Sequence, residues 1–249
     1  MRNYPHLYSE FLKWKHKVNN VNRYYTATPL IKILWDNKGL LTYDILQGDK
    51  FFRGRIFNID EVAPTNEKYI KWIESREEIF QGYDKNASGA PPRTSATEGR
   101  LNGQGISFLY TCKDETTVIY ELRPTKNEKI SIAEFEVKRD LVFADLTRYK
   151  SNEITNPQFS DLIRLIADEF STPHYAGHNY SFTQYLAGQF MDMGFDGVIF
   201  GSSLDSKGEN FVFFYPKDCI AINSRLFMVD DISIKYSCLA QFAVEQRWK

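Results

Sequence analysis

The chain of 249 residues carries 31 basic and 32 acidic side chains, with 43% hydrophobic and 25% charged residues. This composition is typical of a globular protein with one large domain, and the net charge of −1 argues against charge-driven binding of nucleic acid. Because no apolar run approaches the roughly 20 residues of a membrane span and the N-terminus lacks a secretory apolar core, we expect a cytoplasmic protein without membrane contact. Three cysteines without paired spacing (Cys112, Cys219 and Cys238) favour reduced thiols.

Hydrophobic periodicity divides the first hundred residues into five segments. In order, these are a predicted helix at 6–25, a mixed segment at 29–46, a strand at 51–57, a helix at 65–81 and a loop at 82–100. The strand, FFRGRIF, places its two arginines on one face because they are two residues apart. The loop is rich in Gly, Ala, Ser and Pro, and a loop of that length inside a domain is usually functional or disordered.

Short apolar runs dominate the remainder of the chain. We expect a strand that ends at Tyr110, a second one that leads to Glu121, later strands at 130–137, 141–145, 197–201, 211–215 and 232–236, and helices at 157–170 and 181–194. Ser181 is the predicted N-cap of the last helix. Strands and helices do not alternate regularly, so the pattern predicts an α+β fold.

Glu121 is the most informative residue of the chain, because it is a carboxylate embedded in an apolar run. Buried without a partner, such a group costs several kcal/mol. It therefore faces solvent, pairs with Arg100 or Arg123, or is kept in place for chemistry. Arg100, Tyr110 and Glu121 lie ten and eleven residues apart, a spacing that suits three groups brought to one pocket wall by adjacent strands.

Three other patterns argue against familiar kinds of site. The glycines at 99–105 lack the order of a dinucleotide fingerprint and precede a strand. His174 and His178 have the spacing of two metal ligands on a helix, but a proline and a glycine oppose a helix there, so we expect no metal. Ser202 and Ser203 follow a strand without the G-x-S-x-G pattern of a serine hydrolase.

Three segments (FFRGRIF, GRLNGQGISFLYTCKDETTVIYELRP and DGVIFGSSLDSKGENFVFF) together resemble the RES domain, a family named for its Arg, Glu and Ser. The resemblance implies a fold similar to the ADP-ribosyltransferase toxins, a core of short mixed β-sheets with flanking helices, and NAD as substrate. It divides the chain into an N-terminal helical extension at 1–47, a catalytic domain at 48–237 and a C-terminal tail at 238–249. Known members degrade NAD, some as NAD phosphorylases and some as ADP-ribosyltransferases, and they are commonly paired with an Xre-type antitoxin.

Carried over position by position, the resemblance implies roles for eight residues. The catalytic ones are Glu121, Arg53 and Ser202, and the NAD-binding ones are Arg100, Tyr110, Arg55, Asn102 and Ser203. Arg55 is the alternative to Arg53, Ser203 is the alternative to Ser202, and Tyr180 and Asn210 are lesser candidates. The chain departs from smaller members at Gly54, where a tyrosine is often found, and in its N-terminal extension and the long loop before Arg100.

These residue types suit the cleavage of NAD. Guanidinium forks bind pyrophosphate, and a fixed carboxylate stabilises the positive charge that develops on the ribose as nicotinamide leaves. A tyrosine ring can stack on nicotinamide. The resemblance implies an enzyme that cleaves the nicotinamide–ribose bond with phosphate or water as acceptor, as the toxin of a toxin–antitoxin or defence system with a protein antitoxin as partner.

Two other function classes stay open at this point. A mono-ADP-ribosyltransferase would cleave the same bond but deliver the ribose to a protein or a nucleic acid, which is the only role we expect for nucleic acid. A catalytically inactive RES-like binding module is the third class. The presence of Arg53, Glu121 and Ser202 argues against that module.

Overall fold

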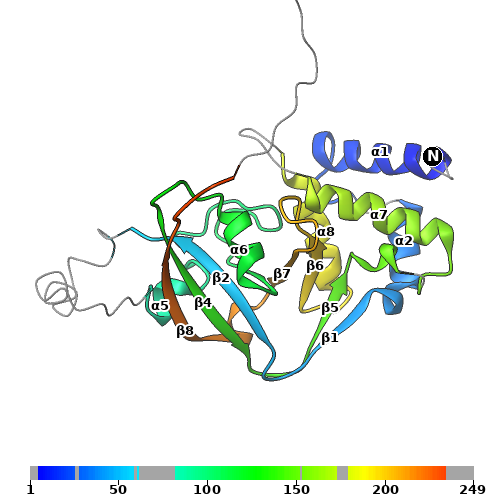
Figure 1. Cartoon of the computed structure of the whole chain (residues 1–249). Coiled ribbons are helices and arrows are strands. Elements are labelled where there is room, and N and C mark those ends of the chain that lie inside the picture. The colour runs from blue at the N-terminus through cyan, green and yellow to red at the C-terminus, as the bar shows by residue number, and fades with distance from the viewer. Residues whose placement is uncertain are drawn as a thin grey trace, which may run out of the picture.

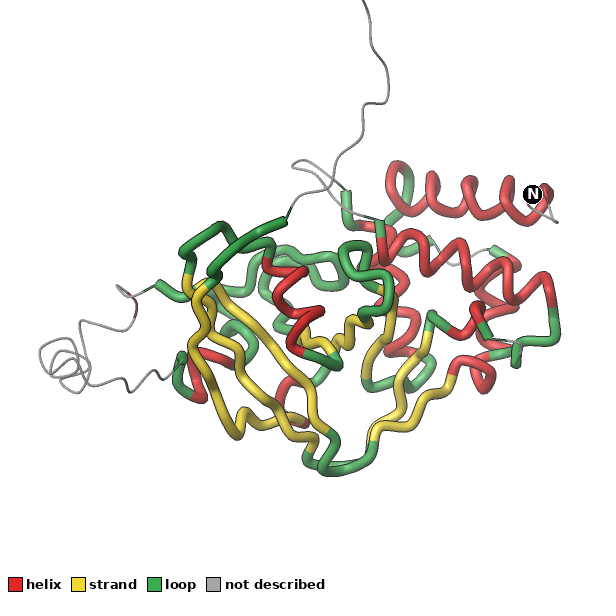
Figure 2. The backbone as a smooth tube through the Cα atoms, viewed as in Figure 1, coloured by secondary structure: helices red, strands yellow, loops and turns green. Residues whose placement is uncertain are grey.

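The computed structural model describes residues 5–25, 28–58, 61, 82–151, 153–172 and 179–233 (Figure 1). These residues form an eight-stranded mixed sheet with helices packed on it, which confirms the α+β prediction (Figure 2). Four predicted features lie outside the described residues: the helix at 65–81, the metal-spaced pair of His174 and His178, Cys238, and the tail at 238–249.

The described helices are α1 (Pro5–Asn20), α2 (Pro29–Asp36), α5 (Lys85–Ser88), α6 (Glu115–Leu122), α7 (Pro157–Ser171) and α8 (Ser181–Asp192). Three short 3₁₀ helices are η1 (Lys38–Leu41), η3 (Arg148–Lys150) and η4 (Pro216–Asp218). The strands are β1 (Thr42–Ile45), β2 (Lys50–Ile56), β3 (Leu109–Cys112), β4 (Lys129–Val137), β5 (Leu141–Asp145), β6 (Gly197–Gly201), β7 (Glu209–Phe213) and β8 (Cys219–Met228).

The sheet has the strand order β1-β5-β6-β7-β3-β2-β4-β8. Neighbouring strands are antiparallel except β5 and β6, which are parallel. Within the described residues, β2 and β3 share one paired position, Phe52 with Cys112, whereas β2 pairs with β4 along its whole length. The sheet therefore consists of two parts, β1-β5-β6-β7-β3 and β2-β4-β8, which meet at a narrow seam.

Helices α1, α2, α7 and α8 pack on the part of the sheet that contains β5 and β6 (Figure 1). Helix α7 begins where the side chain of Asn156 accepts hydrogen bonds from the amides of Gln158 and Phe159, and Pro157 occupies its first turn. The predicted inward stripe of this helix is buried in the structure (Phe159, Leu162, Ile163 and Ile166). Because α1 and α2 belong to the same core cluster, the N-terminal segment is part of the packed structure.

A second core joins the two parts of the sheet. The ring of Phe51 on β2 lies 4.8 Å from that of Phe211 and 5.2 Å from that of Phe213, both on β7, measured between ring centroids. Figure 2 shows the two parts inclined toward each other and joined by turns at one end, one of them at residues 47–49. Aromatic contacts therefore hold the two parts together where backbone pairing does not.

The prediction that a strand carries Glu121 is wrong, because residues 115–122 form helix α6. Thr, Val and Ile favour a strand locally, but Asp114 caps a helix by accepting a hydrogen bond from the Thr117 amide at 2.8 Å. Val118 and Leu122, one helical turn apart, then pack against β2. The helix ends at Arg123, whose φ of 49° lies in the left-handed region.

Two further expectations are corrected. The last strand among the described residues runs over Cys219–Met228; Ile232 and Ser233 belong to no strand, and 234–236 lie outside the described residues. The polar run Asn-Ser-Arg at 223–225 interrupts the apolar pattern from which a strand would be predicted. This edge strand is held instead by backbone pairing with β4. Ser181 is not the N-cap of α8; that position belongs to Tyr180, and the Ser181 amide instead donates to Asn179 Oδ1.

Candidate active site

Glu121 lies in the last turn of α6, and its carboxylate is held by donors from two other segments. Its Oε1 accepts a hydrogen bond from Ser202 Oγ at 2.7 Å and another from Asn210 Nδ2 at 2.9 Å. The C-terminal end of a helix carries partial negative charge, so an acidic side chain is unfavourable there. The two hydrogen bonds offset this preference and keep a carboxylate where helix electrostatics alone would disfavour it.

Ser202 is fixed by the loop at 202–208 that connects β6 to β7. Its Oγ accepts hydrogen bonds from the amides of Leu204 and Asp205, both at 3.1 Å, so its hydrogen is directed to Glu121. Asp205 Oδ2 lies 3.0 Å from the hydroxyl of Thr117, which ties the loop to α6. The loop and α6 are thereby joined by two hydrogen bonds, one of which is the bond from Ser202 to Glu121.

A cavity of about 280 Å³ opens where β2 and β3 separate. Glu121 lines it together with four other candidates named from the sequence or its resemblance (Arg53, Arg100, Tyr110 and Asn210). The remaining lining residues are Phe52, Gly54, Thr111, Cys112, Val118, Leu122 and Phe200. Both β2 and β3 continue along the cavity from their single paired position, so the split in the sheet forms the site.

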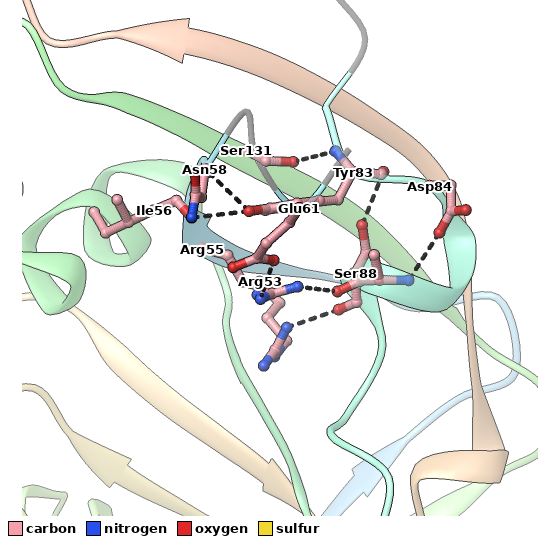
Figure 3. Close-up of polar contacts among 10 residues, drawn as sticks. Arg53, Arg55, Ile56, Asn58, Glu61, Tyr83, Asp84, Ser88 and Ser131 are labelled. Atoms are coloured by element: carbon pink, nitrogen blue, oxygen red, sulfur yellow. Dashed lines mark hydrogen bonds and ion pairs between the residues drawn. The ribbon is translucent and has the colours of Figure 1, made fainter. Parts of the chain in front are cut away.

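Arg53 and Arg55 extend from the same face of β2 toward α5, as Figure 3 shows. Arg53 Nη1 donates to the carbonyl of Ser88 at 2.8 Å, and within the described residues it forms no ion pair. Burial, and secondarily the charge of Arg55, lowers the pKa of Arg53 to about 10. The guanidinium is still cationic at neutral pH, with no carboxylate from the described chain to neutralise it.

Arg55 has different surroundings from Arg53 and does not line the cavity. It donates to the carbonyl of Ala87 at 2.7 Å, pairs with Glu61 at 3.0 Å, and its Cζ lies 4.4 Å from the centre of the Tyr83 ring (Figure 3). Arg55 therefore has an acidic and an aromatic partner, and its contacts with Tyr83 and Ala87 hold the 82–88 segment on β2. Of the two arginines, Arg53 lines the cavity and Arg55 does not.

Arg100 also lines the cavity and is hydrogen-bonded to the C-terminal end of α7. Its guanidinium donates to the carbonyls of Phe170 and Thr172, and its Cζ lies 5.8 Å from the centre of the Phe200 ring. Burial lowers the pKa of Arg100, while the Glu121 carboxylate opposes that shift. In the part of the chain that the structure describes, Arg100 forms no ion pair either, so two cationic groups with neutral partners line one cavity.

Tyr110 uses its hydroxyl to order the loop that precedes β3. The hydroxyl donates to Asn102 Oδ1 at 2.7 Å and accepts from the Leu101 amide at 3.1 Å. Burial raises the pKa of Tyr110, so the phenol remains a donor. Asn102 is buried, and its amide nitrogen donates to three loop carbonyls (Thr97, Gly103 and Ile106). Asn102 therefore supports the site without lining the cavity.

Ser203, the alternative to Ser202, is exposed and is not among the cavity-lining residues. Asn210, a lesser candidate from the sequence, is a direct partner of Glu121. Sequence reasoning missed Thr111, Cys112 and Phe200, whose apolar surroundings gave no sign of a site. A polar residue directly before the apolar run FVFF was the available signal for Asn210.

No cluster of three or more His, Cys, Asp or Glu side chains with metal-binding geometry occurs among the described residues. Within the same residues, no helix combines the length and apolar character needed to cross a bilayer.

Comparison with known proteins identifies the family. The family model of the RES domain matches residues 76–231, which is more than half of the chain, so the chain belongs to the RES domain family. No curated protein shows significant sequence similarity to it. Among solved structures, the crystal structure of the M. tuberculosis MbcT–MbcA toxin–antitoxin complex contains a chain that is 13% identical, with a TM-score of 0.45 over 80% of this chain and 91% of that chain.

Proposed function

We propose that the protein is an enzyme that consumes NAD by cleaving its nicotinamide–ribose bond. The observation that carries the proposal is the Glu121 carboxylate, held on the wall of a cavity by Ser202 and Asn210. Membership of the RES domain family supports the same substrate. A carboxylate fixed in this way is preorganised for positive charge that develops during a reaction.

Charge distribution favours a substrate with a pyrophosphate group. Arg53 and Arg100 line the cavity, and their described partners are neutral backbone carbonyls. A guanidinium bonded to a carbonyl keeps its net charge and can still receive a phosphate oxygen on its remaining N–H groups. We assign these two arginines to the pyrophosphate and Glu121 to the ribose that carries nicotinamide.

The reaction needs little acid catalysis, because the nicotinamide ring of NAD is already cationic and leaves the ribose as a neutral molecule. Loss of this group leaves positive charge on the ribose carbon and its ring oxygen, and the carboxylate of Glu121 lowers the energy of that state. The ring of Tyr110, whose hydroxyl is already bonded, offers a face for stacking on nicotinamide. Phosphate or water then adds to the ribose carbon.

We assign the catalytic domain to residues 48–237 and expect the enzyme to act in the cytoplasm as the toxin of a toxin–antitoxin or defence system. An enzyme that degrades NAD in its own cell must be restrained. We propose a protein antitoxin of the Xre type that covers the mouth of the cavity, and an N-terminal segment (1–47) that contributes packing rather than the docking surface.

Incubation of the purified protein with NAD, with and without phosphate, tests the function. We expect free nicotinamide together with ADP-ribose 1″-phosphate or ADP-ribose, distinguished by mass, and at least about a hundredfold slower product formation in the Glu121→Gln variant. Transfer of the ribosyl group to added protein or nucleic acid would favour the mono-ADP-ribosyltransferase instead. Intact NAD after incubation with folded protein would contradict both reactions and favour a binding module.

A further inference from the structure

Asn210 is bonded to the carboxylate that the proposed function places at the centre of the reaction. We infer that Asn210 is a positioning residue, which fixes Glu121 so that one carboxylate oxygen is held by the protein and the other is left for the substrate. This inference rests on the proposed function for its kinetic consequences. Its structural content, the placement of the carboxylate, can be tested separately.

The orientation of the Asn210 amide is determined by its two neighbours. Nδ2 donates to Glu121 Oε1 at 2.9 Å, and Oδ1 lies 3.4 Å from Cys112 Sγ. Burial raises the pKa of the Cys112 thiol, so the thiol keeps its proton and acts as the donor. With a donor on one side and a carboxylate on the other, only one of the two amide orientations satisfies both contacts.

The placement of Asn210 in the sheet makes it a rigid support. It lies on β7 between two strands and is paired with Phe200 on β6 and with Cys112 on β3. Ser202, the other donor, lies in the loop just after β6. The carboxylate is therefore held by one group from a central strand and one from a loop.

The two donors use the same oxygen of Glu121. Oε1 accepts both hydrogen bonds, and Oε2 accepts none from the described residues. Two donors on one oxygen restrict rotation of the carboxylate, whereas Ser202 alone would allow it to turn about its bond to the chain. Asn210 thus determines which oxygen is available in the cavity, and a fixed group of this kind must keep its geometry within about 0.5 Å.

A merely structural role for Asn210 predicts different kinetics. If it only satisfied buried polar groups, its loss would lower stability and affect the Michaelis constant and turnover without distinction. A positioning role acts on the transition state, so kcat falls while KM, which reflects contacts made by the arginines, changes little. We expect Asn210→Ala to lower kcat about tenfold to a hundredfold, the range for loss of one hydrogen bond to a charged group, with KM within about twofold.

Asn210→Asp supplies a second test, which a structural role would not reproduce. Two carboxylates in contact cannot both ionise without repulsion, and a shared proton restores the donor. The charged or titratable groups that act on this network are Arg100, Cys112, Asp114 and Asp205, and they are unchanged in the variant. We expect Asn210→Asp to approach wild-type kcat at low pH and to lose activity as the pH rises, a descending limb that neither wild type nor Asn210→Ala shows.

Asn223, an exposed residue of β8 that does not line the cavity, is the matched control. Asn223→Ala and Asn223→Asp should both retain wild-type kinetics. A kcat within twofold of wild type in Asn210→Ala, or a pH profile of Asn210→Asp parallel to wild type, would overturn the inference. If Asn210→Ala does not fold, the pH profile of Asn210→Asp decides alone.

Crystal structures of wild type and Asn210→Ala separate this inference from the proposed function. We expect the Glu121 carboxylate to rotate or to occupy two positions in the variant. If wild type does not consume NAD, the proposed function fails. The comparison of the two crystal structures still tests whether Asn210 positions the Glu121 carboxylate. A carboxylate that stays in place without Asn210 would overturn the positioning role.

Discussion

Gly54 of β2 and Val118 of α6 lie so close together that a Cβ atom built at Gly54 would sit 2.4 Å from Val118 Cγ1. The same Cβ atom would sit 2.6 Å from Cδ1 of Leu122, the residue that follows Glu121 in the sequence. The glycine after Arg53, where a tyrosine is often found in smaller RES domains, is therefore required by the contact between β2 and α6. The contact also sets the distance of the Glu121 helix from the strand that carries Arg53.

Gly54→Ala should destabilise the protein by about 1–3 kcal/mol, the range for overpacking a filled interior, and should lower NAD turnover because α6 is displaced. Thermal unfolding and steady-state kinetics measure the two effects. Gly188→Ala in α8 is the control, since a Cβ there meets no atom within 4 Å, and alanine favours a helix. Equal stability of the two variants would contradict the close contact.

Glu121→Gln should reduce NAD turnover by at least about a hundredfold, as expected for removal of one preorganised electrostatic group. Glutamine keeps an oxygen that can accept from Ser202 and Asn210, so the free energy of unfolding should change by less than about 1 kcal/mol. The exposed Glu153, changed to Gln, controls for loss of charge elsewhere. Cell growth during expression should recover in Glu121→Gln, and wild-type turnover in that variant would remove Glu121 from the mechanism.

Arg53→Lys should raise the KM for NAD about tenfold or more, because a point charge cannot replace a guanidinium fork on a phosphate. Arg55→Lys should instead lower the melting temperature, since it loses the contact with the Tyr83 ring and weakens the pair with Glu61. The two variants control for each other, because both keep a positive charge on the same strand. If Arg55→Lys raises KM and Arg53→Lys does not, Arg55 is the substrate-binding arginine.

Stability should fall as the pH rises above about 9, because burial raises the pKa of two thiols. The pKa of Cys219 is raised from 9.0 to about 12, and that of Cys112 is also raised. Above pH 9 the unfolded chain releases these protons while the folded chain keeps them, so the unfolded state is favoured increasingly. Between pH 8 and pH 10, Cys219 should account for about 1 kcal/mol of the loss.

Urea unfolding of wild type and Cys219→Ala at pH 8 and pH 10 isolates this contribution. The variant is less stable at both values because it loses buried atoms, but its decrease between the two should be smaller by about 1 kcal/mol. An identical decrease in both proteins would show that the thiol titrates normally.

The elements with strong patterns could be predicted from the sequence. The β2 strand, the strands at 130–137 and 141–145, and α7 with its buried stripe all follow from apolar periodicity and are present in the structure. Helix α6 could not be predicted, because its β-branched residues favour a strand, and the helix depends on the Asp114 cap and on contact with Gly54. Strand β8 depends on pairing with β4, which lies far away in the sequence.

The candidate site was predictable in its residue types but not in its geometry. Arg53, Arg100, Tyr110 and Glu121 do line one cavity, although Glu121 reaches it from a helix. The sequence could not show that Arg55 is paired elsewhere, since that depends on the ring of Tyr83.

The narrow seam between β2 and β3 bears on when the candidate site is assembled during synthesis of the chain. The chain crosses between the two parts of the sheet repeatedly, since β1, β3 and β5 belong to one part and β2, β4 and β8 to the other. Neither part can fold from one continuous stretch, and pairing of distant segments is slow. The two hydrogen-bond donors to Glu121, Ser202 and Asn210, lie 81 and 89 positions later in the chain and are synthesised after it. A ribosome-bound chain that ends before Asn210 thus has no assembled site, and Glu121 gains both hydrogen-bond donors only after residue 210 has been added.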